Sequence, residues 1–132
     1  MISTRLKNIF AISIPVFIAH GLEEYFTGFY NVDSHFKFMF GYFNTLSTPQ
    51  AVFLLFQIML WFILVISVLL ISGEKWQLWL MIIPGLIYIY ELQHFWKVLT
   101  VGGYYPGAIT AIAFPIVGFL FWKELIKCFN QE

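Results

Sequence analysis

The chain has 132 residues, of which 61% are hydrophobic and 21% aromatic, whereas only 11% are charged. Soluble domains have about a quarter of their residues charged, so this composition indicates an integral membrane protein. Seven basic and seven acidic residues give a net charge of zero, which excludes nucleic-acid binding through a basic surface. The single cysteine, Cys128, cannot form an internal disulfide.

The first apolar segment covers residues 8–30 and resembles a signal peptide in its basic N-terminal side and its small residues around His20. Apolar residues continue beyond that point to Tyr30. The segment therefore reaches the ~20 residues needed to span the hydrocarbon core. We predict an uncleaved first membrane helix.

Three ionisable side chains interrupt this segment within five residues: His20, Glu23 and Glu24. At about 100° per residue, Glu23 lies roughly 60° to one side of His20 and Glu24 roughly 40° to the other. All three therefore share one helix face. Because ionisable groups are costly next to lipid, this face predicts a polar site inside a helix bundle.

Three further helical segments follow, and an aromatic-rich stretch separates them from the first. We interpret residues 31–49 as an interfacial loop or short surface helix and as a candidate lid. The later helices are expected at residues 50–71, 76–99 and 106–124, with glycine-containing turns between them. The sequence thus predicts an all-α, membrane-spanning four-helix bundle that forms one domain over residues 1–132.

The basic residues predict the orientation of this bundle. If both termini are cytoplasmic, only Lys37 and Lys97 lie on the outer side. The remaining basic residues then lie inside: Arg5, Lys7, Lys75, Lys123 and Lys127. This distribution follows the positive-inside rule. We expect a protein of the cytoplasmic or plasma membrane with both termini inside.

A second polar group on the third helix matches the first group in depth. Glu91 follows Trp76 by 15 residues, as Glu23 follows Asn8, and at about 1.5 Å per residue both lie roughly 22 Å along their helices. His94 follows Glu91 by three positions and shares its face. We therefore expect residues 20–24 and 91–94 to face each other inside the bundle.

Imidazoles and carboxylates in this arrangement are candidate ligands for a divalent iron, zinc or manganese ion. The candidate metal ligands are His20, Glu23, Glu24, Glu91 and His94. Carboxylate-bridged di-iron bundles use Glu-x-x-His on two helices and further glutamates. This set is one carboxylate short, and the first helix has the reverse order, so one metal, two metals and no metal all stay open.

The same residues suit acid–base chemistry, because a carboxylate beside a histidine can transfer protons near neutral pH. The candidate catalytic residues are Glu23, Glu24 and His20. Three uncharged side chains are expected to contact the substrate or to support the ligands: Gln57, Tyr88 and Thr110. Alone, such residues are more often interhelical hydrogen-bond partners or packing residues.

Three sequence patterns occur in a fixed order: His20-x-x-Glu23-Glu24, Glu91-x-x-His94 and Tyr105-Pro106-Gly107-x-x-Thr110-Ala111. In these patterns the chain resembles the HXXEE family of small integral membrane proteins, over most of its length. The resemblance implies that His20, Glu23 and Glu24 form the functional core. It supplies no substrate.

These observations predict a membrane-embedded enzyme that acts on a lipophilic small molecule drawn from the surrounding membrane lipids. One alternative is a small proton- or ion-coupled carrier, in which a homo-oligomer would supply the symmetry that four spans lack. Another is a non-catalytic partner subunit whose His–Glu pairs only fix helix packing. Nothing in the sequence resembles a nucleotide-binding loop, a serine nucleophile elbow or a thiol catalytic site.

Overall fold

The computed structural model describes residues 1–131, and all regular structure in this range is helical, as predicted. The elements are α1 (Thr4–Thr27), α2 (Phe29–Val32), α3 (Ser34–Phe40), η1 (Gly41–Thr45), α4 (Thr48–Ile71), α5 (Glu74–Leu80), α6 (Ile82–Tyr90), α7 (Gln93–Val101), α8 (Ala108–Ala111) and α9 (Phe114–Phe129). Three stretches are long and apolar enough to cross a membrane: Thr4–Thr27, Thr48–Ile71 and Glu74–Val101.

Helix α1 begins and ends a few residues earlier than predicted. The Ser3 hydroxyl accepts a hydrogen bond of 3.1 Å from the Leu6 N–H, which satisfies one of the free amides of the first turn. The helix runs through Pro15 and ends where Gly28 adopts a left-handed conformation, a common helix terminator. The polar face around His20 therefore lies in the last two turns of α1.

The third predicted span consists of three short helices that continue one another. Backbone hydrogen bonds between residues three apart, such as Met81 N–H to Leu78 C=O and Leu92 N–H to Ile89 C=O (both 3.1 Å), mark the two junctions. Both junctions keep right-handed helical backbone angles. The span is therefore continuous in direction but tightened at Glu91, the residue expected in the site.

The predicted fourth span, residues 106–124, is divided into α8 and α9. The helix is interrupted after Ala111, and Pro115 lies in the first turn of α9, where its missing N–H leaves no partner unsatisfied. Neither piece has the 18 residues required of a candidate span. The count of four spanning helices is therefore not confirmed.

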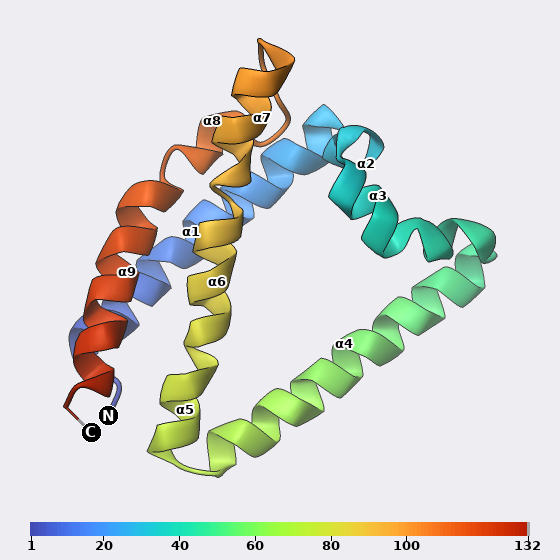
Figure 1. The fold of residues 1–132 in the computed structure, drawn as a ribbon. Coiled ribbons are helices and arrows are strands. Elements are labelled where there is room, and N and C mark those ends of the chain that lie inside the picture. The colour runs from blue at the N-terminus through green and yellow to red at the C-terminus, as the bar shows by residue number, and fades with distance from the viewer. Residues whose placement is uncertain (132) are drawn as a thin grey trace.

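Helices α1, α6 and α9 pack together and enclose the core (Figure 1). The fully buried apolar residues there are Leu6, Leu78, Tyr88, Ala111, Phe114, Phe121, Leu125 and Cys128. Two polar contacts join the helices: the Tyr88 hydroxyl lies 2.5 Å from Ser13 Oγ, and the Trp122 indole N–H donates to the Gly85 carbonyl at 2.9 Å.

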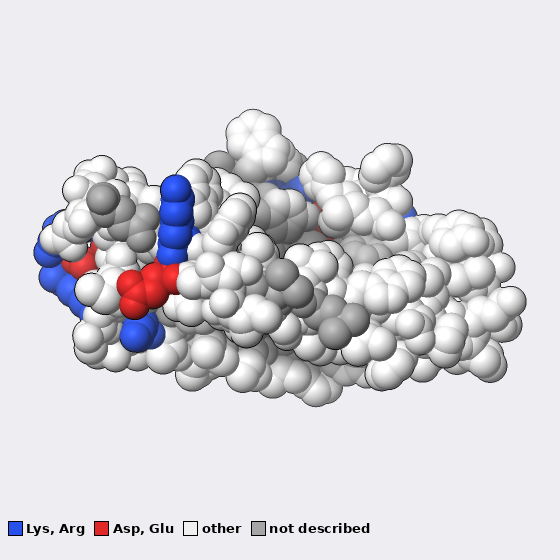
Figure 2. Space-filling view, turned by 90° about the horizontal axis from the view of Figure 1, so that it is seen from below, with Lys and Arg blue, Asp and Glu red and all other residues white. Residues whose placement is uncertain are grey.

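Helix α4 diverges from these three helices and meets α5 at its lower end (Figure 1). Most of its described apolar side chains are exposed. Seen from below, most of the charged side chains in view gather at the end that carries the termini and the α4–α5 turn, and few are visible on the rest of that face (Figure 2). The buried polar side chains that the structure describes lie outside α4: Ser13 and His20 on α1, Asp33 before α3, His94 on α7 and Glu124 on α9.

Candidate metal centre

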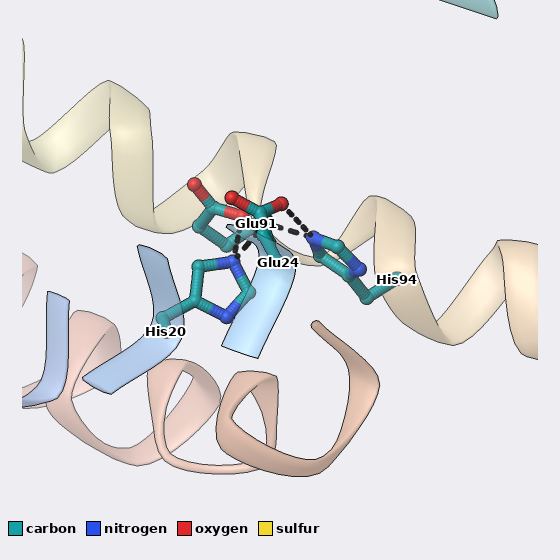
Figure 3. A group of neighbouring side chains, drawn as sticks. All are labelled: His20, Glu24, Glu91 and His94. Atoms are coloured by element: carbon teal, nitrogen blue, oxygen red, sulfur yellow. Dashed lines mark hydrogen bonds and ion pairs between the residues drawn. The ribbon is translucent and has the colours of Figure 1, made fainter. Parts of the chain in front are cut away.

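Two imidazoles and two carboxylates meet at the upper end of the packed helices (Figure 3). His20 and Glu24 come from α1, Glu91 follows the last residue of α6, and His94 lies in the first turn of α7. One ligand atom from each lies within 4.8 Å of all the others. The prediction that residues 20–24 face residues 91–94 is therefore confirmed.

The nitrogen and oxygen atoms of this His/Glu cluster face one another. His20 Nε2 lies 2.9 Å from Glu91 Oε2 and 3.5 Å from Glu24 Oε1. His94 Nε2 lies 3.3 Å from the same two oxygen atoms. Both imidazoles are buried, and both carboxylates are partly buried.

Neither ring nitrogen of His94 has a hydrogen bond, although two carboxylate oxygens lie 3.3 Å from its Nε2 atom. A buried polar atom without a hydrogen bond is uncommon and needs an explanation. A cation among the four donor atoms would accept the Nε2 lone pair of His94, although His20 Nε2 also lies within hydrogen-bond distance of Glu91 Oε2 (2.9 Å). The cluster therefore has the donor types and the convergence of a metal site.

A hydroxyl group fixes the orientation of the His20 ring. Thr110 Oγ donates its single proton to Glu23 Oε2 at 2.5 Å and lies 2.9 Å from His20 Nδ1. With that proton engaged, the hydroxyl can only accept from the His20 Nδ1–H. The Nε2 lone pair of His20 is then directed at the cluster, which is how a hydrogen-bonded support prepares a histidine ligand.

Glu23 lies beside the cluster and not in it. Besides the Thr110 hydroxyl, its carboxylate accepts from the backbone N–H groups of Ile109 (3.1 Å) and Thr110 (2.8 Å) and from the Tyr104 hydroxyl (2.7 Å). These contacts hold the first turn of α8 against α1. The structure thus separates two neighbouring glutamates, since Glu24 faces the imidazoles and Glu23 supports them.

Gly107 brings the backbone directly against the cluster. A Cβ atom at this position would lie 2.7 Å from His94 Cε1, 2.9 Å from Glu24 Cγ and 2.9 Å from His20 Cε1. Its φ of +87° also favours glycine. The residue was noted in the Tyr-Pro-Gly pattern, but sequence alone gave no sign that it lies against three of the four cluster residues.

A family model described as "Protein of unknown function with HXXEE motif" matches residues 11–121. The chain belongs to the HXXEE family. The resemblance predicted from the sequence patterns is therefore confirmed. Searches of curated proteins and of solved structures gave no significant match.

The geometry gives each position of the HXXEE motif a separate contact in this chain. His20 reaches the cluster through Nε2, Glu24 reaches it through Oε1, and Glu23 reaches α8. The α6–α7 segment contributes Glu91 and His94. Spacing could place these side chains on common faces, but it could not show which glutamate turns toward the partner helix.

Aromatic rings enclose the two histidines of this HXXEE protein. The His20 ring meets Phe114 edge-on with the centroids 5.0 Å apart. The His94 ring lies 5.6 Å from Phe29 and 5.9 Å from Tyr105. Such a shell limits water access and lowers the local polarity, which strengthens electrostatic interactions in the site.

A neighbouring acidic residue, Asp33, fastens the α2–α3 segment over this shell. Its carboxylate accepts from the Phe36 N–H and the Tyr105 hydroxyl, both at 2.8 Å, and lies 3.5 Å from the Lys97 ammonium. Burial by itself raises the pKa of Asp33, but these three partners hold it below its ordinary value. Asp33 falls within the predicted lid, residues 31–49, but the sequence does not predict its partners.

The remaining predicted residues lie in different places. Thr110 supports His20, as described above. Tyr88 lies in the core, where it contacts Ser13 and stacks on Phe17 with a centroid distance of 5.1 Å. Gln57 belongs to α4, the helix that diverges from the site (Figure 1). Of the three predicted supporting residues, the structure brings Thr110 alone to the cluster.

An apolar groove of about 390 Å³ adjoins the cluster between α7 and α8. Its lining includes His94, Val98, Leu99, Tyr104, Ile109 and Ile112. The volume falls within the range of about 300–1,000 Å³ typical of small-molecule sites. A histidine of the cluster thus forms one wall of an otherwise apolar groove.

Proposed function

We propose that this protein is a membrane-embedded metalloprotein whose His/Glu cluster holds one divalent ion of the iron, manganese or zinc class. The observation that carries the proposal is the convergence of four donor atoms from two separate chain segments, one of which, His94 Nε2, has no hydrogen bond. Imidazole nitrogens mixed with carboxylate oxygens suit these metals better than magnesium or calcium, which prefer oxygen ligands alone.

One ion fits this donor set better than two. A two-metal site of the di-iron type uses four glutamates and two histidines. Here the carboxylates available to metal are Glu24 and Glu91, because the oxygens of Glu23 are engaged by α8 and Tyr104. Two imidazoles and two carboxylates can complete a tetrahedral shell or leave a position for water or substrate, depending on the metal.

The adjoining groove supports a lipophilic substrate for the same site. Its lining is apolar except at His94 and Tyr104, so a hydrocarbon chain could lie along α7 and α8 with its reactive end at the cluster. A bound ion would polarise a carbonyl group or activate a water molecule there. The protein would then supply the orientation of the chain and the exclusion of water by Phe29, Tyr105 and Phe114.

Elemental analysis tests the metal assignment. The full chain is purified in detergent without chelators, incubated separately with Fe²⁺, Mn²⁺ and Zn²⁺, and freed of unbound ion. We expect about one ion per chain in the wild type and less than a tenth of that in His94→Ala and Glu91→Gln, because losing a ligand removes a donor that the remaining three cannot replace.

His35→Ala is the matched control, because His35 is exposed and lies outside the cluster. It should bind as much metal as the wild type. Failure of the wild type to retain any of the three ions, or equal retention in the cluster variants, would refute the metal assignment.

The metal-free alternative is an acid–base site with a proton in place of the ion. It is supported by the 2.9 Å contact between His20 Nε2 and Glu91 Oε2, since two lone pairs at that distance need a proton between them when no metal is present. In this version Glu24, Glu91 and the two histidines carry protons for the same lipophilic substrate. Absence of metal from active protein would favour it.

A further inference from the structure

A second cavity lies between the α3–η1 segment and α4, apart from the metal centre. Its volume is about 690 Å³, again within the size range of ligand sites. The lining residues include Asn31, Phe36, Lys37, Phe40, Asn44 and Leu55. We refer to it as the α3–α4 cavity.

One part of the α3–α4 cavity is polar and positively charged. The side chains of Lys37, Asn31 and Asn44 are exposed, and within residues 1–131 none of them has a hydrogen-bond or ion-pair partner. Two amide groups and an ammonium are all able to donate hydrogen bonds. The cavity lining contains no acidic residue.

The acidic residue nearest to Lys37 in the sequence, Asp33, forms no ion pair with it. Asp33 lies one helical turn before it, but its oxygens are engaged by Lys97, Tyr105 and the Phe36 N–H. Lys97 thus has an acidic partner, whereas Lys37 has none among residues 1–131. The α3–α4 cavity therefore carries one uncompensated positive charge, which suits a ligand group with one negative charge.

The other part of the cavity is apolar and continues onto α4. Phe36 and Phe40 stack with centroids 4.7 Å apart, and Phe43 follows at 6.2 Å from Phe40. Leu55 supplies the wall from α4, and the next turns of α4 expose Met59 and Phe62. Since α4 stands apart from the packed helices at its upper end and meets α5 only at its lower end (Figure 1), its apolar surface can receive a hydrocarbon chain.

We propose that the α3–α4 cavity binds a glycerophospholipid, with the phosphodiester on Lys37 and an acyl chain along Phe40, Leu55 and α4. The monoanionic phosphodiester matches the single charge, and the amides of Asn31 and Asn44 donate to its oxygens. A free phosphate ion would leave the aromatic wall unused. The assignment does not depend on the metal centre.

Native mass spectrometry of the full chain in detergent tests this lipid site. The probes are phosphatidylglycerol, diacylglycerol with the same chains, and inorganic phosphate. We expect one tightly bound phosphatidylglycerol and much weaker binding of the other two. Lys37→Gln should weaken phosphatidylglycerol binding about tenfold, the scale of one charge-assisted hydrogen bond.

Lys75→Gln is the matched control, because it removes the same charge from an exposed lysine at the other end of α4. Its affinity should equal that of the wild type. Leu55→Trp, which fills the apolar part and keeps the charge, should also weaken binding. Circular dichroism verifies that each variant retains its helices.

Four results would overturn the proposal. Equal losses in Lys37→Gln and Lys75→Gln would mean non-specific attraction of anionic lipid. Equal binding of diacylglycerol would remove the role of the phosphate. Competition by inorganic phosphate at the affinity of the lipid, or an unaltered affinity in Leu55→Trp, would remove the role of the acyl chain.

Discussion

At the residue scale, Gly107 connects the α8 segment most directly to the His/Glu cluster. Its left-handed backbone conformation and three neighbouring side-chain atoms disfavour any residue with a Cβ atom at this position. In Gly107→Ala we expect roughly 1–2 kcal/mol of left-handed strain and roughly 1–3 kcal/mol of overpacking. The variant should also lose metal, because the new methyl group displaces His20, Glu24 or His94.

Gly102 provides the control for backbone strain. It has a φ of +70°, and a Cβ there would meet no atom within 4 Å. Gly102→Ala should therefore show the left-handed strain alone and keep its metal. Thermal unfolding and metal content measured on both variants separate the two effects. Equal behaviour of the two variants would mean that Gly107 does not constrain the cluster.

The two adjacent glutamates of the motif should respond differently to the same substitution. Glu24→Gln removes a charged ligand and should lower metal affinity at least about 100-fold, whereas Glu23→Gln should lower it by only about 10-fold through the orientation of His20. Glu23→Gln should cause the larger loss of thermal stability, because four donors lose a charged acceptor. Metal titration and thermal unfolding of both variants distinguish the two roles. A larger loss of metal affinity in Glu23→Gln than in Glu24→Gln would contradict them.

At the element scale, Asp33 fastens α2–α3 to α7 and to the loop before α8. The folded pKa of Asp33 lies below its unfolded value of about 3.9. Its carboxylate therefore stabilises the fold at neutral pH, and this contribution disappears as the pH falls through the folded pKa. Asp33→Asn should be less stable than the wild type by about 1–3 kcal/mol at pH 7, with the difference decreasing below about pH 4.

Thermal unfolding at a series of pH values measures that difference. The stability losses caused by Lys97→Gln and Asp33→Asn should not be additive in the double variant, since the two side chains lie 3.5 Å apart. If the wild type remains more stable than Asp33→Asn by the same amount from pH 7 to pH 3, ionisation of Asp33 does not contribute to that stability.

Helix periodicity was sufficient to predict that α1 and the segment around Glu91 meet in the site, but not that α4 stays outside it or how the helices are interrupted. The shared faces and depth of His20 and Glu91 predicted their meeting, because both follow from the regular geometry of a helix. The junction at Glu91 and the break after Ala111 depend on tertiary packing. The role of Glu23 depends on α8, and the predicted span over residues 106–124 does not distinguish α8 from α9.

At the scale of the whole molecule, composition predicted an apolar helical protein but could not predict the position of α4. A uniformly apolar helix such as Thr48–Ile71 has no distinct face that specifies a partner. The polar residue Gln57 suggested an inward face, yet α4 diverges from the packed helices (Figure 1). The site is therefore formed by three chain segments, α1, α6–α7 and α8, where sequence analysis expected contributions from four helices.

The distribution of charge predicts how the molecule lies in a membrane. The termini and the α4–α5 turn share one end, where the charged side chains gather (Figure 2), and Lys37 lies beyond the opposite end of α4. If α4 crosses the bilayer with the termini in the cytoplasm, Lys37 and Lys75 lie on opposite sides.

In a Cys128→Ala background, a membrane-impermeant maleimide should label Lys37→Cys in intact cells and Lys75→Cys only after permeabilisation. Labelling of both in intact cells, or of neither, would mean that α4 does not cross, and labelling of Lys75→Cys alone would reverse the orientation.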